Sequence, residues 1–186
     1  MKNLIALLLL GFSVLAQEKE STHSYELRTN VLGLISQGNY NLSAEKFASK
    51  TWSYGLSIGT TQSAKQKSNF DEGNNRHLAQ WELTPFVRVR LSKSNRSYYF
   101  AEAFSSINQG QYKAVIRQTD TPGNAYYLVS KGNYTDLALG GSLGYKLLLK
   151  SVIPVEFLVG FGSNILHPQQ SPAVVSRVGL SVGYQF

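Results

Sequence analysis

The sequence predicts an all-β fold, an eight-stranded antiparallel up-and-down transmembrane β-barrel, and three observations support it. Apolar and polar residues alternate in repeated segments, as they do in strands with two different faces. Short and long turn-rich connections alternate between these segments, which is the layout of membrane barrels. The 186 residues include no cysteine, and no segment after the N-terminal apolar run is long enough for a transmembrane helix.

The N-terminus has the features of a secretory signal peptide. In residues 1–16, Lys2 precedes an apolar run, and Ala16 provides the small residue expected before a cleavage site. The run is too short to cross a bilayer. We expect residues 1–16 to be a cleaved signal peptide, 17–23 a short segment and 24–186 the barrel. The alternative is a buried N-terminal helix, which the polar stretch after residue 16 disfavours.

Eight segments of alternation follow along the chain, and the first, second and fifth are the weaker ones. They cover residues 25–35, 40–47, 52–60, 80–91, 98–107, 135–146, 155–163 and 176–186. The fifth is ambiguous in phase; if Glu102 faces inward, Tyr98, Phe100 and Phe104 face inward with it, and we adopt this phase. That strand can extend through 111–118 above the membrane.

Pro85 lies within the fourth segment, where a closed barrel has no free edge to accommodate a proline. It predicts a local bulge.

The connections predict the orientation of the barrel. They are short after the second, fourth and sixth strands and longer after the third, fifth and seventh. Periplasmic turns are short and extracellular loops long in such barrels, so both termini should lie on the periplasmic side. The first connection, "SQGN", is expected to be short although it lies on the extracellular side.

The face opposite the bulky apolar residues carries Gly, Ser and charges of both signs. A soluble sandwich would instead place its long charged side chains outside, in water. Small residues and paired charges suit the narrow interior of eight strands. The expected lumen ion-pair network consists of Glu45, Glu82, Arg88, Arg90, Glu102, Asp136, Lys146, Glu156 and Arg177. We interpret it as a plug that satisfies buried charges; a narrow proton or ion path is the alternative.

Aromatic residues near the strand ends predict the two interfacial girdles of a membrane barrel. Trp52, Tyr145, Tyr184 and Phe186 are assigned to the periplasmic girdle, and Tyr40, Trp81 and Phe161 to the other.

The chain ends in strict alternation through Leu180, Val182, Tyr184 and Phe186. This pattern resembles the assembly signal that Gram-negative outer-membrane proteins present to the barrel-assembly machinery. Together with residues 27–47, it makes the chain similar to a family of small outer-membrane barrels, like those of outer-membrane proteins A and X. The resemblance implies a bacterial outer-membrane location, with outer-membrane lipid and the assembly machinery as partners. We expect a monomer.

Catalytic chemistry has little support in the sequence. None of the three histidines is followed two residues later by serine, as in one class of barrel lipase. His77, Asp71 and Ser68 share a long connection and could be arranged as in a palmitoyl transferase, whereas His167 and Ser171 are assigned to a solvated loop. Because these residues are common in loops, we predict no catalytic residue, no metal site and no cofactor.

The net charge of +7 is not concentrated in a run, so nucleic acid is not expected as a partner. Loop cations could meet lipopolysaccharide phosphates or could simply be solvated; they are Lys65, Lys67, Arg76, Lys113, Arg117 and Lys131. The predicted function is a structural or surface-interaction role. The alternatives are a lipid-modifying enzyme (lipid A deacylase or acyltransferase type) and a narrow small-solute pore.

Overall fold

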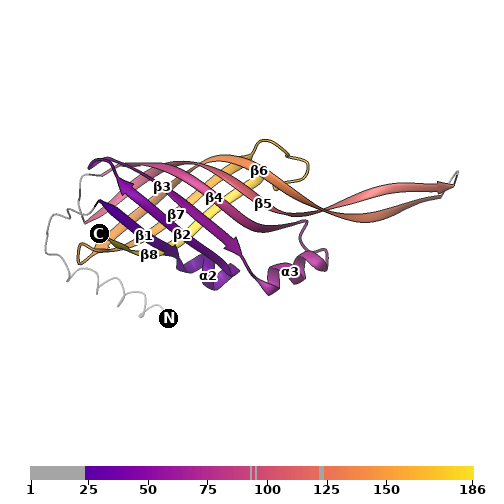
Figure 1. Cartoon of the computed structure of the whole chain (residues 1–186), viewed down its shortest axis with the longest axis horizontal. Helices are drawn as coiled ribbons and strands as arrows, with labels where there is room; N and C mark the ends of the chain where they lie inside the picture. The colour runs from indigo at the N-terminus through magenta and orange to yellow at the C-terminus, as the bar shows by residue number, and fades with distance from the viewer. Residues whose placement is uncertain (1–23, 93, 95, 122–123) are drawn as a thin grey trace, which may run out of the picture.

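The structure is a computed structural model, and it describes residues 24–92, 94, 96–121 and 124–186. Eight antiparallel strands follow one another around a closed barrel, and β8 pairs with β1 (Figure 1). The predicted eight-stranded up-and-down barrel is confirmed. The expected signal peptide and residues 17–23 lie outside the described residues.

The strands differ greatly in length. They are β1 (Tyr25–Asn30), β2 (Asn39–Phe47), β3 (Trp52–Thr61), β4 (His77–Arg90), β5 (Ser97–Thr121), β6 (Asn124–Leu149), β7 (Ile153–Asn164) and β8 (Val174–Gln185). The helices are α2 (Val31–Gln37) and α3 (Ala64–Asp71). Neither of these described helices has the length and apolar content needed to cross a membrane.

Along the strands of the barrel wall, outward and inward side chains alternate as the sequence predicts. On β3, for example, Leu56 and Ile58 are exposed on the outside, whereas Ser57 between them is buried. On β5, Tyr98, Phe100 and Phe104 are buried with Glu102, as predicted.

Several large inward rings fit the narrow lumen because they lie over a glycine of a neighbouring strand. Phe86 is paired with Gly55, and Phe100 with Gly144. A Cβ added to Gly55 would lie 2.4 Å from the Phe86 ring and 2.3 Å from the Ala44 carbonyl oxygen. The glycines of the polar face therefore provide the space that the rings fill.

Two local predictions are wrong. Pro85 pairs in regular register with Leu56, and the shift in the β4–β5 ladder lies between Ala79 and Trp81 instead. The predicted strand 25–35 ends at Asn30, where α2 begins.

α2 forms because both of its ends are capped. The Asn30 side chain accepts a hydrogen bond from the Gly33 amide, and Gly38 adopts the left-handed conformation (φ 61°). The helix occupies the connection that was expected to be only a short loop.

The two ends of the barrel are unlike. At the short-turn end, tight connections join β2 to β3, β4 to β5 and β6 to β7, and the C-terminus lies there (Figure 1). At the opposite end, β5 and β6 continue beyond the barrel as a long hairpin. We call the part of it formed by residues 113–121 and 124–131 the arm, and this end the arm end.

Candidate functional site

A dense group of buried charges lies in the lumen toward the short-turn end. We call it the lumen cluster, and it consists of Glu26, Arg28, Glu45, Arg88, Glu102, Lys146, Glu156 and Arg177. Arg88 lies at its centre, with Nε 2.7 Å from Glu102 and Nη1 2.9 Å from Glu45. The same guanidinium reaches Glu156 at 2.7 Å and stacks on the Phe100 ring.

Lys146 and Arg28 bridge several carboxylates in the same way. The Lys146 ammonium lies 2.8 Å from Glu26, 3.1 Å from Glu45 and 3.3 Å from Glu156. Arg28 pairs with these three glutamates as well, whereas Arg177 pairs with Glu102. Because three of the four cations each contact several carboxylates, the cluster is one network rather than a set of separate pairs.

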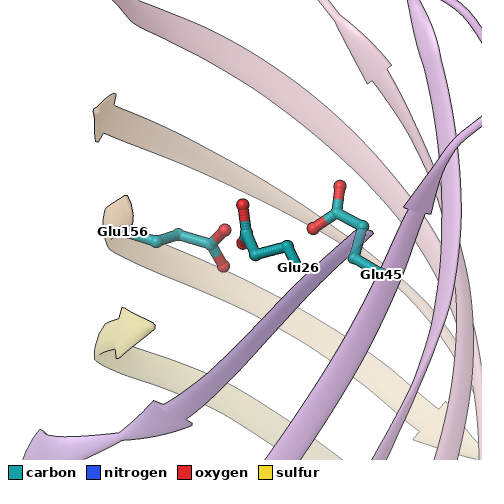
Figure 2. Close-up of side chains that lie close together, drawn as sticks. All are labelled: Glu26, Glu45 and Glu156. Carbon is teal, nitrogen blue, oxygen red and sulfur yellow. The ribbon is translucent and has the colours of Figure 1, made fainter. Parts of the chain in front are cut away.

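Three carboxylates of the cluster converge in a way that could suit a metal ion. Oxygen atoms of Glu26, Glu45 and Glu156 lie within 4.8 Å of one another, and Figure 2 shows them facing a common space. Arg28 and Lys146 bind all three of them, however, and the cluster's four carboxylates face four cations. Glu26 Oε2 has no hydrogen-bond partner among the described residues, but each of the three carboxylates is already paired with protein cations, so the arrangement does not fit a metal centre.

The structure brings six of the predicted network residues into the cluster: Glu45, Arg88, Glu102, Lys146, Glu156 and Arg177. The other three lie elsewhere. Arg90 stacks on Tyr98 at 3.8 Å, Glu82 faces a cavity toward the arm end, and Asp136 fastens a loop. The prediction missed Glu26 and Arg28, although alternation in the first weak segment already placed both on the polar face.

Asp136 organises the loop between β7 and β8. Its carboxylate accepts hydrogen bonds from the backbone amides of Leu166 and His167, both at 2.9 Å, and from the Ser171 hydroxyl at 2.5 Å. The His167 Nδ1 lies 3.1 Å from the Thr135 carbonyl oxygen. Because the serine is bonded to the carboxylate and the imidazole to a carbonyl, this arrangement does not activate a nucleophile.

The other potential catalytic set is also not assembled. The Ser68 hydroxyl donates to Glu72 at 2.6 Å, and Asp71 pairs with Lys131 at 2.8 Å. The His77 ring packs edge-on against Tyr134. These groups have separate partners, so the palmitoyl-transferase-like arrangement is not formed in the structure.

α3 fastens the base of the arm to the barrel. Phe70 is buried beneath Lys113 and Lys131, whose ammonium groups lie 4.9 and 5.6 Å from its ring centre. Lys113 also donates to the carbonyl oxygens of Phe70 and Asp71. The hydrogen bond from Lys131 lowers the pKa of Asp71, and the charges of Lys113 and Lys67 act in the same direction.

The arm has two free edges. β5 pairs with β4 only as far as Tyr112, and β6 pairs with β7 only from Ala138 onward. One face of the arm carries the cross-strand pairs Val115–Val129 and Arg117–Tyr127, and the other carries Ile116–Leu128 and Gln118–Tyr126. These side chains are exposed on both faces, so the arm is an unpartnered ribbon of cationic and apolar character.

The predicted girdle residues Trp52, Trp81, Tyr145 and Tyr184 lie exposed on the outer surface. So do the predicted assembly-signal residues Leu180, Val182, Tyr184 and Phe186. Phe186 is held in place, since its amide and carbonyl both bond to Tyr25, whose ring stacks on its own at 6.2 Å.

Comparison with known proteins gives a match at the level of fold. No protein-family model matches the chain, and no curated protein sequence matches it either. Among solved structures, the chain is similar to the N-terminal β-barrel domain of Pseudomonas aeruginosa OprF, with a TM-score of 0.56 and 11% identity, covering 88% of this chain and 98% of that one.

The chain therefore has the fold of eight-stranded outer-membrane β-barrels. It is also similar to Neisserial surface protein A, with a TM-score of 0.53 and 8% identity, covering 88% of this chain and 94% of that one. Ail of Yersinia pestis matches with a TM-score of 0.44 and 10% identity, covering 88% and 94%.

Proposed function

We propose that this protein is a bacterial outer-membrane barrel, exported by a cleaved signal peptide, whose role is to present the arm at the cell surface. The observation that carries the proposal is the exposed arm with two unpaired strand edges. An isolated two-stranded ribbon is marginally stable, and exposed strand edges are sites where another strand can pair. A partner that contributes an extended segment would complete the sheet.

The outer surface supports the membrane location. Leu42, Leu143, Phe157 and Phe161 are large apolar side chains about half exposed or more, on β2, β6 and β7. A wall of this kind is unfavourable in water and favourable against lipid tails. The C-terminus and the start of β1, which lie at the short-turn end, would then be periplasmic, and the arm extracellular.

The lumen cluster supports a structural rather than a conducting barrel. Its charges are mutually paired, and Phe86 and Phe100 lie against Arg88. We infer that this packing closes the lumen to ions. Single-channel recordings of the purified barrel should show no conductance steps, and regular steps would contradict the closed lumen.

Site-specific photo-crosslinking on intact cells tests the role of the arm. A crosslinker in place of Arg117 or Tyr127 should give a discrete adduct, whereas one in place of Gln169, in the β7–β8 loop, should not. Val129→Pro removes a backbone donor from β6 and should abolish the adduct, while heat-modifiability on a gel shows that the barrel has folded. Adducts that survive Val129→Pro, or none at any arm position, would argue against strand addition.

A further inference from the structure

The lumen is not filled along its whole length. Toward the arm end, the structure contains two cavities of about 160 and 210 Å³. Both are lined by Gln37, Asn39, Glu82 and Ser176, so they adjoin one another. The first also reaches Arg177 at the edge of the lumen cluster. A polar space therefore lies beyond the closed part of the barrel.

Two hydrogen-bond acceptors without donors converge on this space. No hydrogen bond or ion pair joins Glu82 to another described residue, and the buried Asn39 Oδ1 has no hydrogen-bond partner among them. A Cβ added to Gly59 would lie 3.1 Å from Glu82 Oε1 and 3.4 Å from Asn39 Oδ1. Since Gly59 has no side chain, both oxygens face the same small open volume.

The charges around Glu82 indicate what this volume would accept. The lumen cluster is balanced without Glu82. Arg177 also lines the cavity and its charge attracts Glu82, but its guanidinium makes its ion pair with Glu102, at 2.6 Å. A partly buried carboxylate that no cation contacts directly is costly. One carboxylate and one amide oxygen are fewer ligands than Ca²⁺ takes, whereas a primary ammonium has three N–H donors for such acceptors.

We propose that the cavity over Gly59 binds a primary ammonium group, with Glu82 as its counterion and Asn39 Oδ1 as a second acceptor. The ammonium could be carried by a free amine that enters from the arm end, or by the ethanolamine headgroup of a membrane lipid.

The lipid route is provided by the seam between β8 and α2. β8 pairs with β1 only through Ser181–Gln185. α2 packs against β8 toward the arm end of the barrel. The Asn30 side chain donates to the Val178 carbonyl oxygen at 3.3 Å across this seam. On its outer side, α2 exposes Ile35 to 79%. A lipid would thus lie next to a wall closed by a helix rather than by a continuous strand ladder.

Isothermal titration of the folded barrel in detergent tests the proposal, with ethanolamine as the free amine and lysophosphatidylethanolamine as the lipid-borne one. At least one should bind saturably to the unmodified protein. Glu82→Gln and Gly59→Ala should each weaken that binding about tenfold or more. The first removes the negative charge of the acceptor, and the second places a methyl group in the volume between the Glu82 and Asn39 oxygens. The exposed Glu72→Gln should bind as the unmodified protein does, and tetramethylammonium, which has no N–H, should bind more weakly.

The two amines separate the sources of the ligand. Binding of ethanolamine supports a free solute, and binding of the lysolipid alone supports delivery through the seam. Absence of saturable binding by both amines, or unchanged affinity in Glu82→Gln, would overturn the proposal. Heat-modifiability must show that each variant is folded; if Gly59→Ala is not, Asn39→Ala tests the second acceptor in its place.

Discussion

Replacing Arg88 with methionine should destabilise the barrel strongly, because this side chain neutralises three buried carboxylates at once. It lies within 3 Å of Glu45, Glu102 and Glu156, and its side chain is 3% exposed. Methionine keeps much of the packing volume and removes the charge. Removing one partner of a buried ion pair costs about 3–5 kcal/mol, and we expect a loss of this size in the free energy of unfolding.

The measurement is a urea titration of the folded barrel in lipid vesicles, followed by the fluorescence of Trp52 and Trp81. Adding Glu45→Gln to Arg88→Met should restore part of the stability, since the three remaining carboxylates of the cluster would again face three cations. The exposed Arg76→Met is the control and should change little. If Arg88→Met were as stable as this control, the lumen cluster would not be a coupled network.

Three further variants test other parts of the fold. Gly55→Ala should cost about 1–3 kcal/mol, because its Cβ would overlap a phenylalanine ring and a carbonyl oxygen, whereas Gly141→Ala, with its nearest neighbour at 3.5 Å, should be nearly neutral in the same titration. Asn30→Ala removes the helix cap and the bond across the seam, so amide exchange in α2 should accelerate while the β3–β4 ladder stays protected. The pKa of Asp71 is lowered by Lys131, so its contribution is present at neutral pH and is lost as the pH falls through the lowered pKa; proteolysis of the arm should increase on acidification and lose that dependence in Asp71→Asn.

Alternation in the sequence was sufficient to predict which side of each strand faces the lumen. Placing Glu102 inward fixed the positions of Tyr98, Phe100 and Phe104, because side chains two residues apart share a face. The same reasoning placed Glu82 and Asp136 on the inner face. It could not tell that neither joins the lumen cluster, since depth along the barrel depends on the register between strands.

α2 was missed because residues 31–35 are mostly apolar and were included in the first predicted strand. The signals for a helix were present at its ends, in Asn30 as a cap and Gly38 as a left-handed terminator. A helix of seven residues is too short to show a clear period of its own. Its position depends on contact with β8, including the bond from Asn30 to Val178, which is distant in the sequence.

The irregular features of this barrel gather at one end. α2, the register shift after Ala79, the two cavities and the arm all lie away from the short-turn end. Each costs stability, through lost ladder pairing, unfilled volume or exposed strand edges. The lumen cluster and the contacts of Phe186 with Tyr25 concentrate stabilising interactions at the other end. A barrel held firmly at its short-turn end can tolerate a helix in its wall and a free ribbon above it, and the ligand site and the partner site that we propose both lie at this irregular end.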